Sequence, residues 1–167
     1  MLEIRKATAS DAESILEYCK VIGGETDNLT FGAEGVSITI EKEKEYLESI
    51  LRSDKQLYLI AIDNNEIVGT AVFSSYTKPR LAHRAEISLS VKKAMWGNHI
   101  GTRFMEEIID FAKNIANIEI ISLEVRSDNE RAIALYKKFG FETIGTFPCF
   151  MKINGEDVNC DIMRLRL

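Results

Sequence analysis

The sequence is poor in several residue types, and each shortage excludes a class of protein. It contains two histidines and three cysteines, and neither set has the spacing of a metal site or of a disulfide framework. We therefore predict no bound metal, and we expect most of the cysteines to be small buried side chains. Two prolines and no low-complexity tract leave no linker, so we expect a single domain over residues 1–167.

Long hydrophobic runs and a strong positive charge are also missing. The longest stretch without a charged residue, 67–77, is too short to cross a bilayer, which needs about 20 apolar residues. The N-terminal segment MLEIRKATAS lacks the apolar centre of a signal peptide, so we expect a cytoplasmic protein with no membrane partner. The formal net charge of −5 argues against nucleic acid as a partner, although a local basic patch would still suit a small anion.

The spacing of the apolar residues predicts a sheet covered by helices. After a short N-terminal strand, helical periodicity is present at 10–23, 39–53, 103–117 and 129–140. Strand-like runs are present at 56–63, 66–76, 83–91, 118–125, 141–147 and 157–167. The expected fold class is therefore α/β (α+β): a mixed, mostly antiparallel central sheet of about seven strands flanked by about four helices.

Local signals mark the ends of several elements. Ser10 and Glu13 have the spacing of a capping box at the start of the first helix. Two asparagines at 64–65, between two apolar runs, indicate a hairpin, and Gly140 stands where the last helix is expected to end. The apolar residues of the long helix keep helical spacing and should face the core: Phe104, Ile108, Phe111, Ala112 and Ile115.

The segment MWGNHIGTRF, residues 95–104, joins a predicted strand to this long helix. Lys92, Lys93 and Arg103 are the only charged residues in 91–105, so the segment carries three positive charges and no negative one. The first amides of a helix lack intrahelical partners and lie at the positive end of its dipole, so they suit a phosphate. An ordinary turn remains the alternative. A nucleotide P-loop is disfavoured, because no Gly-Lys-Ser/Thr follows.

The last predicted helix carries two polar residues on one face. Asn129 and Tyr136 are seven positions apart and therefore lie two turns apart on the same side. Near the end of a strand, such a pair can line a cleft. The alternative is that Tyr136 is a core aromatic residue and that Asn129 only caps the helix.

Together these segments resemble a known family. SLSVKKAMWGNHIGTRFMEEII and EVRSDNERAIALYKKFGFETIG are similar to the core of the GCN5-related N-acetyltransferases (GNAT), and the resemblance extends over nearly the whole chain. In the family's phosphate loop, Trp96 replaces a Gln or Arg and His99 replaces the first Gly, whereas Gly101 fits. The most specific part is N-x-x-A-x-x-L-Y-x-x-x-G-F, which is matched in full by Asn129, Ala132, Leu135, Tyr136, Gly140 and Phe141.

The resemblance implies an acetyl-CoA-dependent N-acetyltransferase in which a primary amine attacks directly. The acceptor is expected to be a small-molecule amine, or a protein N-terminus or lysine. Asn129 would hydrogen-bond the pantetheine arm, and Tyr136 would protonate the leaving thiolate. The strand end would bind the pantetheine through its backbone and the loop would wrap the pyrophosphate, which implies these cofactor-binding residues: Leu89, Ser90, Val91, Trp96, Gly97, Asn98, His99, Ile100, Gly101 and Thr102.

The base that deprotonates the amine is less clear from the sequence. Glu86 shares a strand face with Ser88 and Ser90, so it is our candidate base, acting directly or through a water; a surface carboxylate is the alternative. His83 is a second candidate.

The resemblance implies that the acceptor lies between the loop GGETDNLTFG and the last two strands. We expect Glu25, Asp27 and Glu34 to attract a cationic amine there. Phe31 and Phe150 would pack on it. The late strands also offer a surface on which two copies could pair, so a homodimer is possible.

Two rival functions remain. One is a non-catalytic CoA-binding module with the same fold, which the unusual Trp96 and His99 would favour. The other is a nucleotide hydrolase, which the missing P-loop lysine disfavours.

Overall fold

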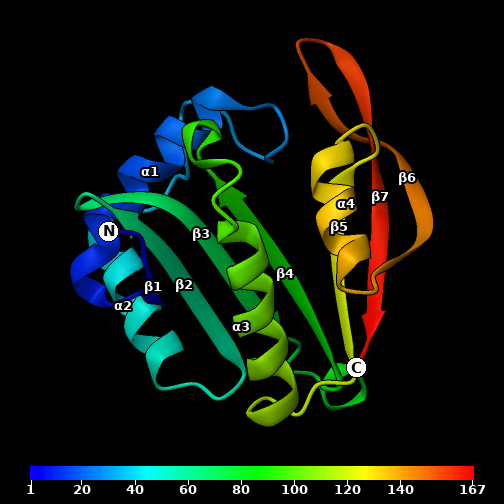
Figure 1. Ribbon diagram of the computed structural model, residues 1–167, viewed down its shortest axis with the longest axis horizontal. Coiled ribbons are helices and arrows are strands. Elements are labelled where there is room, and N and C mark those ends of the chain that lie inside the picture. Colours follow the sequence, from blue (N-terminus) through cyan, green and yellow to red (C-terminus); the bar gives the residue numbers. More distant parts are fainter.

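Seven strands form one mixed sheet in the computed structural model, which describes residues 1–167. The strand order is β1-β2-β3-β4-β5-β7-β6, and only the β4–β5 pair is parallel. The predicted fold class is confirmed (Figure 1). The strands are β1 Glu3–Lys6, β2 Gln56–Asp63, β3 Glu66–Ser75, β4 Arg84–Val91, β5 Ile120–Arg126, β6 Glu142–Ile153 and β7 Glu156–Arg166. The α-helices are α1 Ala12–Glu25, α2 Ile40–Leu51, α3 Ile100–Asn114 and α4 Glu130–Lys138.

The strand β2 is buried on both faces of the sheet. Side chains alternate along a strand, so Leu57 and Leu59 join the core beneath α3, whereas Tyr58 and Ile60 join a second core beneath α1 and α2. A strand of this kind reads as a continuous apolar run rather than an alternating one. None of the helices is both long and apolar enough to cross a lipid bilayer.

Short-range signals formed as predicted at two turns. Asn64 and Asn65 both have positive φ, 49° and 64°, as a two-residue hairpin between β2 and β3 requires. At the end of α4, Gly140 has φ of 92°, and the amides of Gly140 and Phe141 donate to the carbonyls of Lys137 and Tyr136. This is a Schellman cap, and it returns the chain beside Tyr136.

Three expectations about element ends were wrong. The capping box uses Thr8 and Asp11 instead of Ser10 and Glu13, because a 3₁₀ turn precedes α1. Ile115 follows the end of α3 and is 51% exposed.

The last error concerns β6, which continues to Ile153 rather than ending near residue 147. The interruption at Pro148 hides the continuation in the sequence. It is tolerated because β6 is an edge strand, whose pairing with β7 shifts register between Phe147 and Met151.

The sheet opens between β4 and β5. These strands pair only where Arg84–Glu86 faces Ile120–Ser122, whereas β4 stays paired with β3 as far as Val91. Figure 1 shows the two strands meeting near the C-terminus and diverging toward the other end of the molecule. One edge of β4 therefore has no partner strand beyond Glu86, and the candidate site lies in this gap.

Candidate active site

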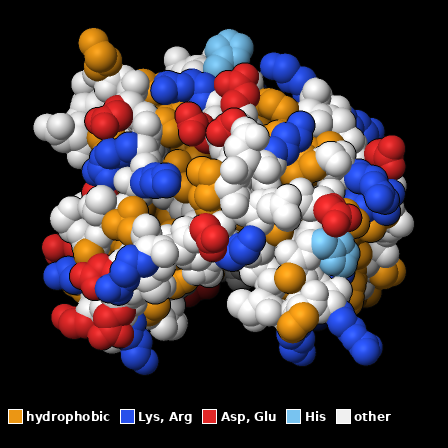
Figure 2. Space-filling view, turned by 90° about the horizontal axis from the view of Figure 1, so that it is seen from below, with side chains coloured by type: hydrophobic (Ala, Val, Ile, Leu, Met, Phe, Trp, Pro, Cys, Tyr) orange, Lys and Arg blue, Asp and Glu red, His pale blue; other side chains and the backbone are white.

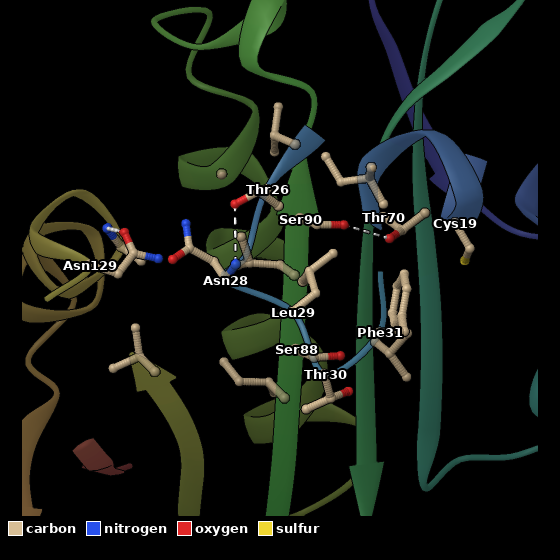
Figure 3. Close-up of a pocket in the computed structure, with 18 of the residues that line it drawn as sticks. Cys19, Thr26, Asn28, Leu29, Thr30, Phe31, Thr70, Ser88, Ser90 and Asn129 are labelled. Carbon is tan, nitrogen blue, oxygen red and sulfur yellow. Dashed lines mark hydrogen bonds between the residues drawn. The ribbon is translucent and has the colours of Figure 1, made fainter. Parts of the chain in front are cut away.

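A cleft of about 1250 Å³ occupies the opening between β4 and β5. Its walls come from the end of α1, the loop after it, β4, the turn before α3, α4 and the β6–β7 hairpin. Ligand pockets commonly have volumes of about 300–1,000 Å³, so this cleft has room for more than one small molecule. Figure 3 shows Ser88 and Ser90 on β4, with Asn28 and Asn129 on one side of them and Thr70 and Cys19 on the other.

The turn before α3 presents a row of free amides. Gly97 and His99 both have left-handed φ, 87° and 58°, and the first intrahelical bond of α3 runs from Arg103 to the His99 carbonyl. No protein group accepts a hydrogen bond from the amides of residues 99–102. These amides lie at the positive end of a 15-residue helix and can together hold an oxyanion such as a phosphate.

Close packing holds this turn against its neighbours. A Cβ on Gly101 would lie 2.9 Å from Cδ2 of Leu135, so the glycine allows α3 to begin close to α4. The indole N–H of Trp96 donates to the Val91 carbonyl at 3.0 Å, and the Arg131 guanidinium lies 4.5 Å from the centre of the Trp96 ring. Trp96 thus ties the turn to both the end of β4 and the start of α4.

Most of the predicted cofactor-binding residues line the cleft, and Asn98 does not. Its side-chain amide instead donates to the Met95 carbonyl at 3.0 Å, inside the turn. The residues that do line the cleft are Leu89, Ser90, Val91, Trp96, Gly97, His99, Ile100, Gly101, Thr102, Asn129 and Tyr136.

The open edge of β4 presents unpaired backbone groups. The amide of Lys92 donates to the Val68 carbonyl at 2.9 Å, so even-numbered residues here point their polar groups toward β3. Because this direction alternates along a strand, the polar groups of Leu89 and the amide of Val91 face the gap without a partner, whereas the Val91 carbonyl accepts from the Trp96 indole. An extended ligand in the gap can therefore hydrogen-bond to β4 as a missing strand would.

Two residues of α4 face the gap from the other side. Asn129 caps the helix, with its side-chain oxygen accepting from the Ala132 amide at 3.2 Å, which leaves its side-chain N–H groups available. Tyr136 is 6% exposed and packs against Phe141, with ring centres 5.7 Å apart. Its hydroxyl has no hydrogen-bond partner, and burial raises its pKa to about 12. It is therefore a neutral proton donor at ordinary pH.

The structure places Glu86 beside the main cleft and not in its wall. Glu86 accepts a hydrogen bond from the Tyr76 hydroxyl and lines a neighbouring groove of about 480 Å³. The carboxylate that lines both cavities is Glu124 on β5. Burial, and secondly the charge of Glu86, raise the pKa of Glu124 above its usual value. Glu124 is exposed at the wall of the cleft, and a carboxylate with a raised pKa suits proton transfer.

The structure places most of the predicted acceptor-side residues in the wall of the cleft and one of them outside it. Glu25, Phe31 and Phe150 all line the cleft, as does Asp27. The Glu25 carboxylate already accepts from the Lys93 amide at 2.8 Å, so it also fixes the segment after β4. Glu34 is not part of the cleft wall, and it accepts a hydrogen bond from the amide of Gly32 in its own loop.

Sequence reasoning missed four charged residues of the cleft: Glu43, Glu124, Arg126 and Arg131. For Glu124 a signal existed, since it alternates with the apolar Leu123 and Val125 and so faces the same side of the sheet as Glu86. Glu43 and Arg131 lie on helices whose faces become cleft walls only through tertiary packing. The structure brings together no cluster of three or more His, Cys, Asp or Glu side chains of the kind that holds a metal.

A mixed sheet that splits between β4 and β5, with free amides beside the split, is the architecture of the N-acetyltransferases. The chain belongs to the acetyltransferase (GNAT) family, whose profile matches residues 27–141. It is 31% identical over 105 residues to the L-amino acid N-acetyltransferase AaaT of Escherichia coli, which covers 63% of this chain and 65% of AaaT. The aligned segment thus spans less than two thirds of that relative.

Solved structures agree in fold. A GNAT-family acetyltransferase from Streptococcus pneumoniae has a TM-score of 0.95 and 26% identity, with 100% of both chains covered. The protein YncA from Salmonella typhimurium was solved with its cofactor acetyl-CoA. It has a TM-score of 0.84 and 20% identity, covering 99% of this chain and 94% of its own. At 20% identity this second likeness shows the fold alone.

Proposed function

We propose that the protein is an acetyl-CoA-dependent N-acetyltransferase that acetylates a primary amine by direct attack. The observation that carries the proposal is the unpaired edge of β4, which ends at a turn of free amides and shares one cleft with Glu124 and Tyr136. Membership of the GNAT family and the presence of acetyl-CoA in a structural neighbour support this reading.

The residues present fit acetyl-CoA, which when bound supplies an acetyl thioester. The amides of residues 99–102 would hold the pyrophosphate, with Lys93 and Arg131 in the same cleft wall adding positive charge. The backbone of Leu89 and Val91, together with the side-chain N–H groups of Asn129, would bind the amide-bearing pantetheine arm. Donors fixed along β4 would also stabilise negative charge that develops on the acetyl oxygen.

Proton transfer is assigned to two groups on opposite sides of the gap. Glu124 accepts the proton of the attacking amine, directly or through a water, because it is the carboxylate of β4 and β5 that lines the cleft. Glu86 acts on Glu124 through its charge in the adjoining groove. Tyr136 donates its hydroxyl proton to the leaving thiolate, and its buried, neutral state keeps that proton available.

The test is a thiol-release assay with acetyl-CoA and a panel of amines and peptides. We expect amine-dependent release that falls by roughly 10²-fold or more in Glu124→Gln, the usual range for loss of a general base. Glu86→Gln serves as the matched control and should lose much less. Failure of acetyl-CoA to raise the melting temperature refutes the proposal, and equal losses in the two variants refute the assignment of the base.

One observation favours a second candidate, a module that binds CoA without turnover. His99 holds a left-handed conformation where the family usually has glycine, so the phosphate turn departs from the common pattern. Binding of acetyl-CoA with no thiol release across the whole amine panel would support this alternative.

A further inference from the structure

The cleft has an inner part, between α1, α2 and the sheet, that the proposed chemistry does not use. Glu43 of α2 lies in its wall, only 5% exposed, and makes no side-chain hydrogen bond or ion pair. Every fully buried side-chain oxygen or nitrogen in the structure has a hydrogen-bond partner. The unpartnered carboxylate oxygens of Glu43 are therefore not sealed in the core, and they are reached from the cleft.

The groups around Glu43 are neutral. Burial, and secondly the charge of Glu43, raise the pKa of Cys19 to about 11 and also raise the pKa of Tyr46. Burial also raises the pKa of Tyr58, with smaller contributions from Cys19 and then Glu43. The wall residues contributed by α2, β2 and β3 include no lysine or arginine; they are Glu43, Tyr46, Tyr58, Thr70 and Val72. The inner part thus presents one carboxylate among aromatic and small side chains, with no cation to balance it.

This arrangement suits a cationic ligand. A buried carboxylate without a partner is unfavourable, and an arriving ammonium would supply both the missing charge and the missing hydrogen-bond donors. Tyrosine rings beside the carboxylate add favourable contacts for an alkylammonium through their electron-rich faces. A ligand with a carboxylate at this end would be repelled.

The strand register relates this position to the centre of transfer. Tyr58 of β2 pairs with Val72 of β3, and Val72 pairs with Ser88 of β4. Directly paired residues share a face of the sheet, so the three side chains form a row. Two strand spacings separate Tyr58 from Ser88 by about 10 Å. Figure 3 shows Ser90 of β4 hydrogen-bonded to Thr70 of β3, with Cys19 of α1 beyond them on the same side of β4.

We propose that Glu43 binds the second ammonium of a linear diamine acceptor while the first amine is acetylated beside β4. This substrate class rests on the proposed acetyltransferase function. With the second ammonium beside Tyr58 and the reacting amine beside Ser88, the two nitrogens of a good acceptor lie about 10 Å apart. The row from Ser88 through Val72 to Tyr58 would accommodate the apolar chain between them.

The experiment compares the terminal diamine of heptane with heptylamine, which has the same chain and one amine. Thiol release and calorimetric binding in the presence of CoA are measured for the wild type and for Glu43→Gln. We expect the variant to weaken diamine binding and raise its KM by roughly tenfold to a hundredfold, the usual effect of losing a hydrogen bond to a charged group. Heptylamine constants and acetyl-CoA binding should not change.

Glu41→Gln is the matched control, because it removes the same charge from an exposed position on the same helix. Equal effects of Glu43→Gln on both amines, or no preference of the wild type for the diamine, would overturn the proposal. Acetyl-CoA binding and heptylamine turnover report on the proposed function separately. If acetyl-CoA does not bind, calorimetry with the diamine alone still tests Glu43.

A wild-type measurement keeps the proposal testable if Glu43→Gln does not fold. The preference for diamine over heptylamine should fall as the pH is lowered through the raised pKa of Glu43. Cys19, Tyr46 and Tyr58, the titratable groups around it, stay neutral over that range. A preference that does not change with pH would contradict the role of Glu43.

Discussion

Tyr136→Phe separates a chemical role from a structural one. The hydroxyl has no hydrogen-bond partner in the structure, and the ring packing against Phe141 is unaffected by its removal. Losing a bonded buried hydroxyl would cost about 1 kcal/mol, so losing this unbonded one should change the free energy of unfolding by less than about 1 kcal/mol. For a chain of this length that corresponds to a melting shift below about 4 °C.

The effect on catalysis should be much larger. If the hydroxyl protonates the leaving thiolate, kcat falls by roughly 10²-fold or more, while the affinity for acetyl-CoA is retained. Stopped thiol-release assays give kcat, and calorimetry with acetyl-CoA gives the affinity. An unchanged kcat refutes the role of Tyr136 as the acid. A drop of many degrees in melting temperature would show instead that the hydroxyl is structural.

Three further predictions concern charge and backbone conformation. The Arg5 guanidinium lowers the pKa of Asp11 from 3.8 to about 2 by two hydrogen bonds of 2.8 Å. This pair therefore stabilises the fold above about pH 4 and ceases to do so as the pH falls toward 2. In urea unfolding, Asp11→Asn should lower the free energy of unfolding by about 1–2 kcal/mol at pH 7 but by little at pH 2. Glu86→Gln should shift the acidic limb of the profile of kcat against pH to lower pH, because the charge of Glu86 raises the pKa of Glu124. An unchanged acidic limb would show that the charge of Glu86 does not act on the group that titrates there. His99→Gly should raise the free energy of unfolding by less than about 1 kcal/mol without weakening acetyl-CoA binding in thermal melts, since glycine tolerates the left-handed φ of 58°. A weaker complex would show that the imidazole contributes to binding.

The predicted site residues that line the cleft are mainly those that the chain itself places close together. Leu89, Gly101 and Thr102 line one cleft because a strand end leads through a short turn into a helix start. The α4 pair, Asn129 and Tyr136, follows from helical spacing together with the family motif. The residues in each of these two groups lie close together in the sequence, so the sequence pattern could predict that they share a surface.

The choice between carboxylates could not be predicted in this way. Glu86 and Glu124 face the same side of the sheet, and both are compatible with the alternation of their strands. Which of them reaches the cleft depends on where β4 and β5 stop pairing, a contact between segments more than thirty residues apart in the sequence. Local periodicity contains no information about that point.

The sequence by itself determined the local geometry. It determined the asparagine hairpin, the glycine cap after Tyr136 and the basic turn before α3, because each depends on the φ preference or charge of adjacent residues. Tertiary structure alone decided the opening between β4 and β5, the carboxylate that lines it, and the burial of Glu43 without a partner. Those features arise from packing between elements distant in the chain, where the surroundings of a side chain, and not its own spacing, set its charge and exposure.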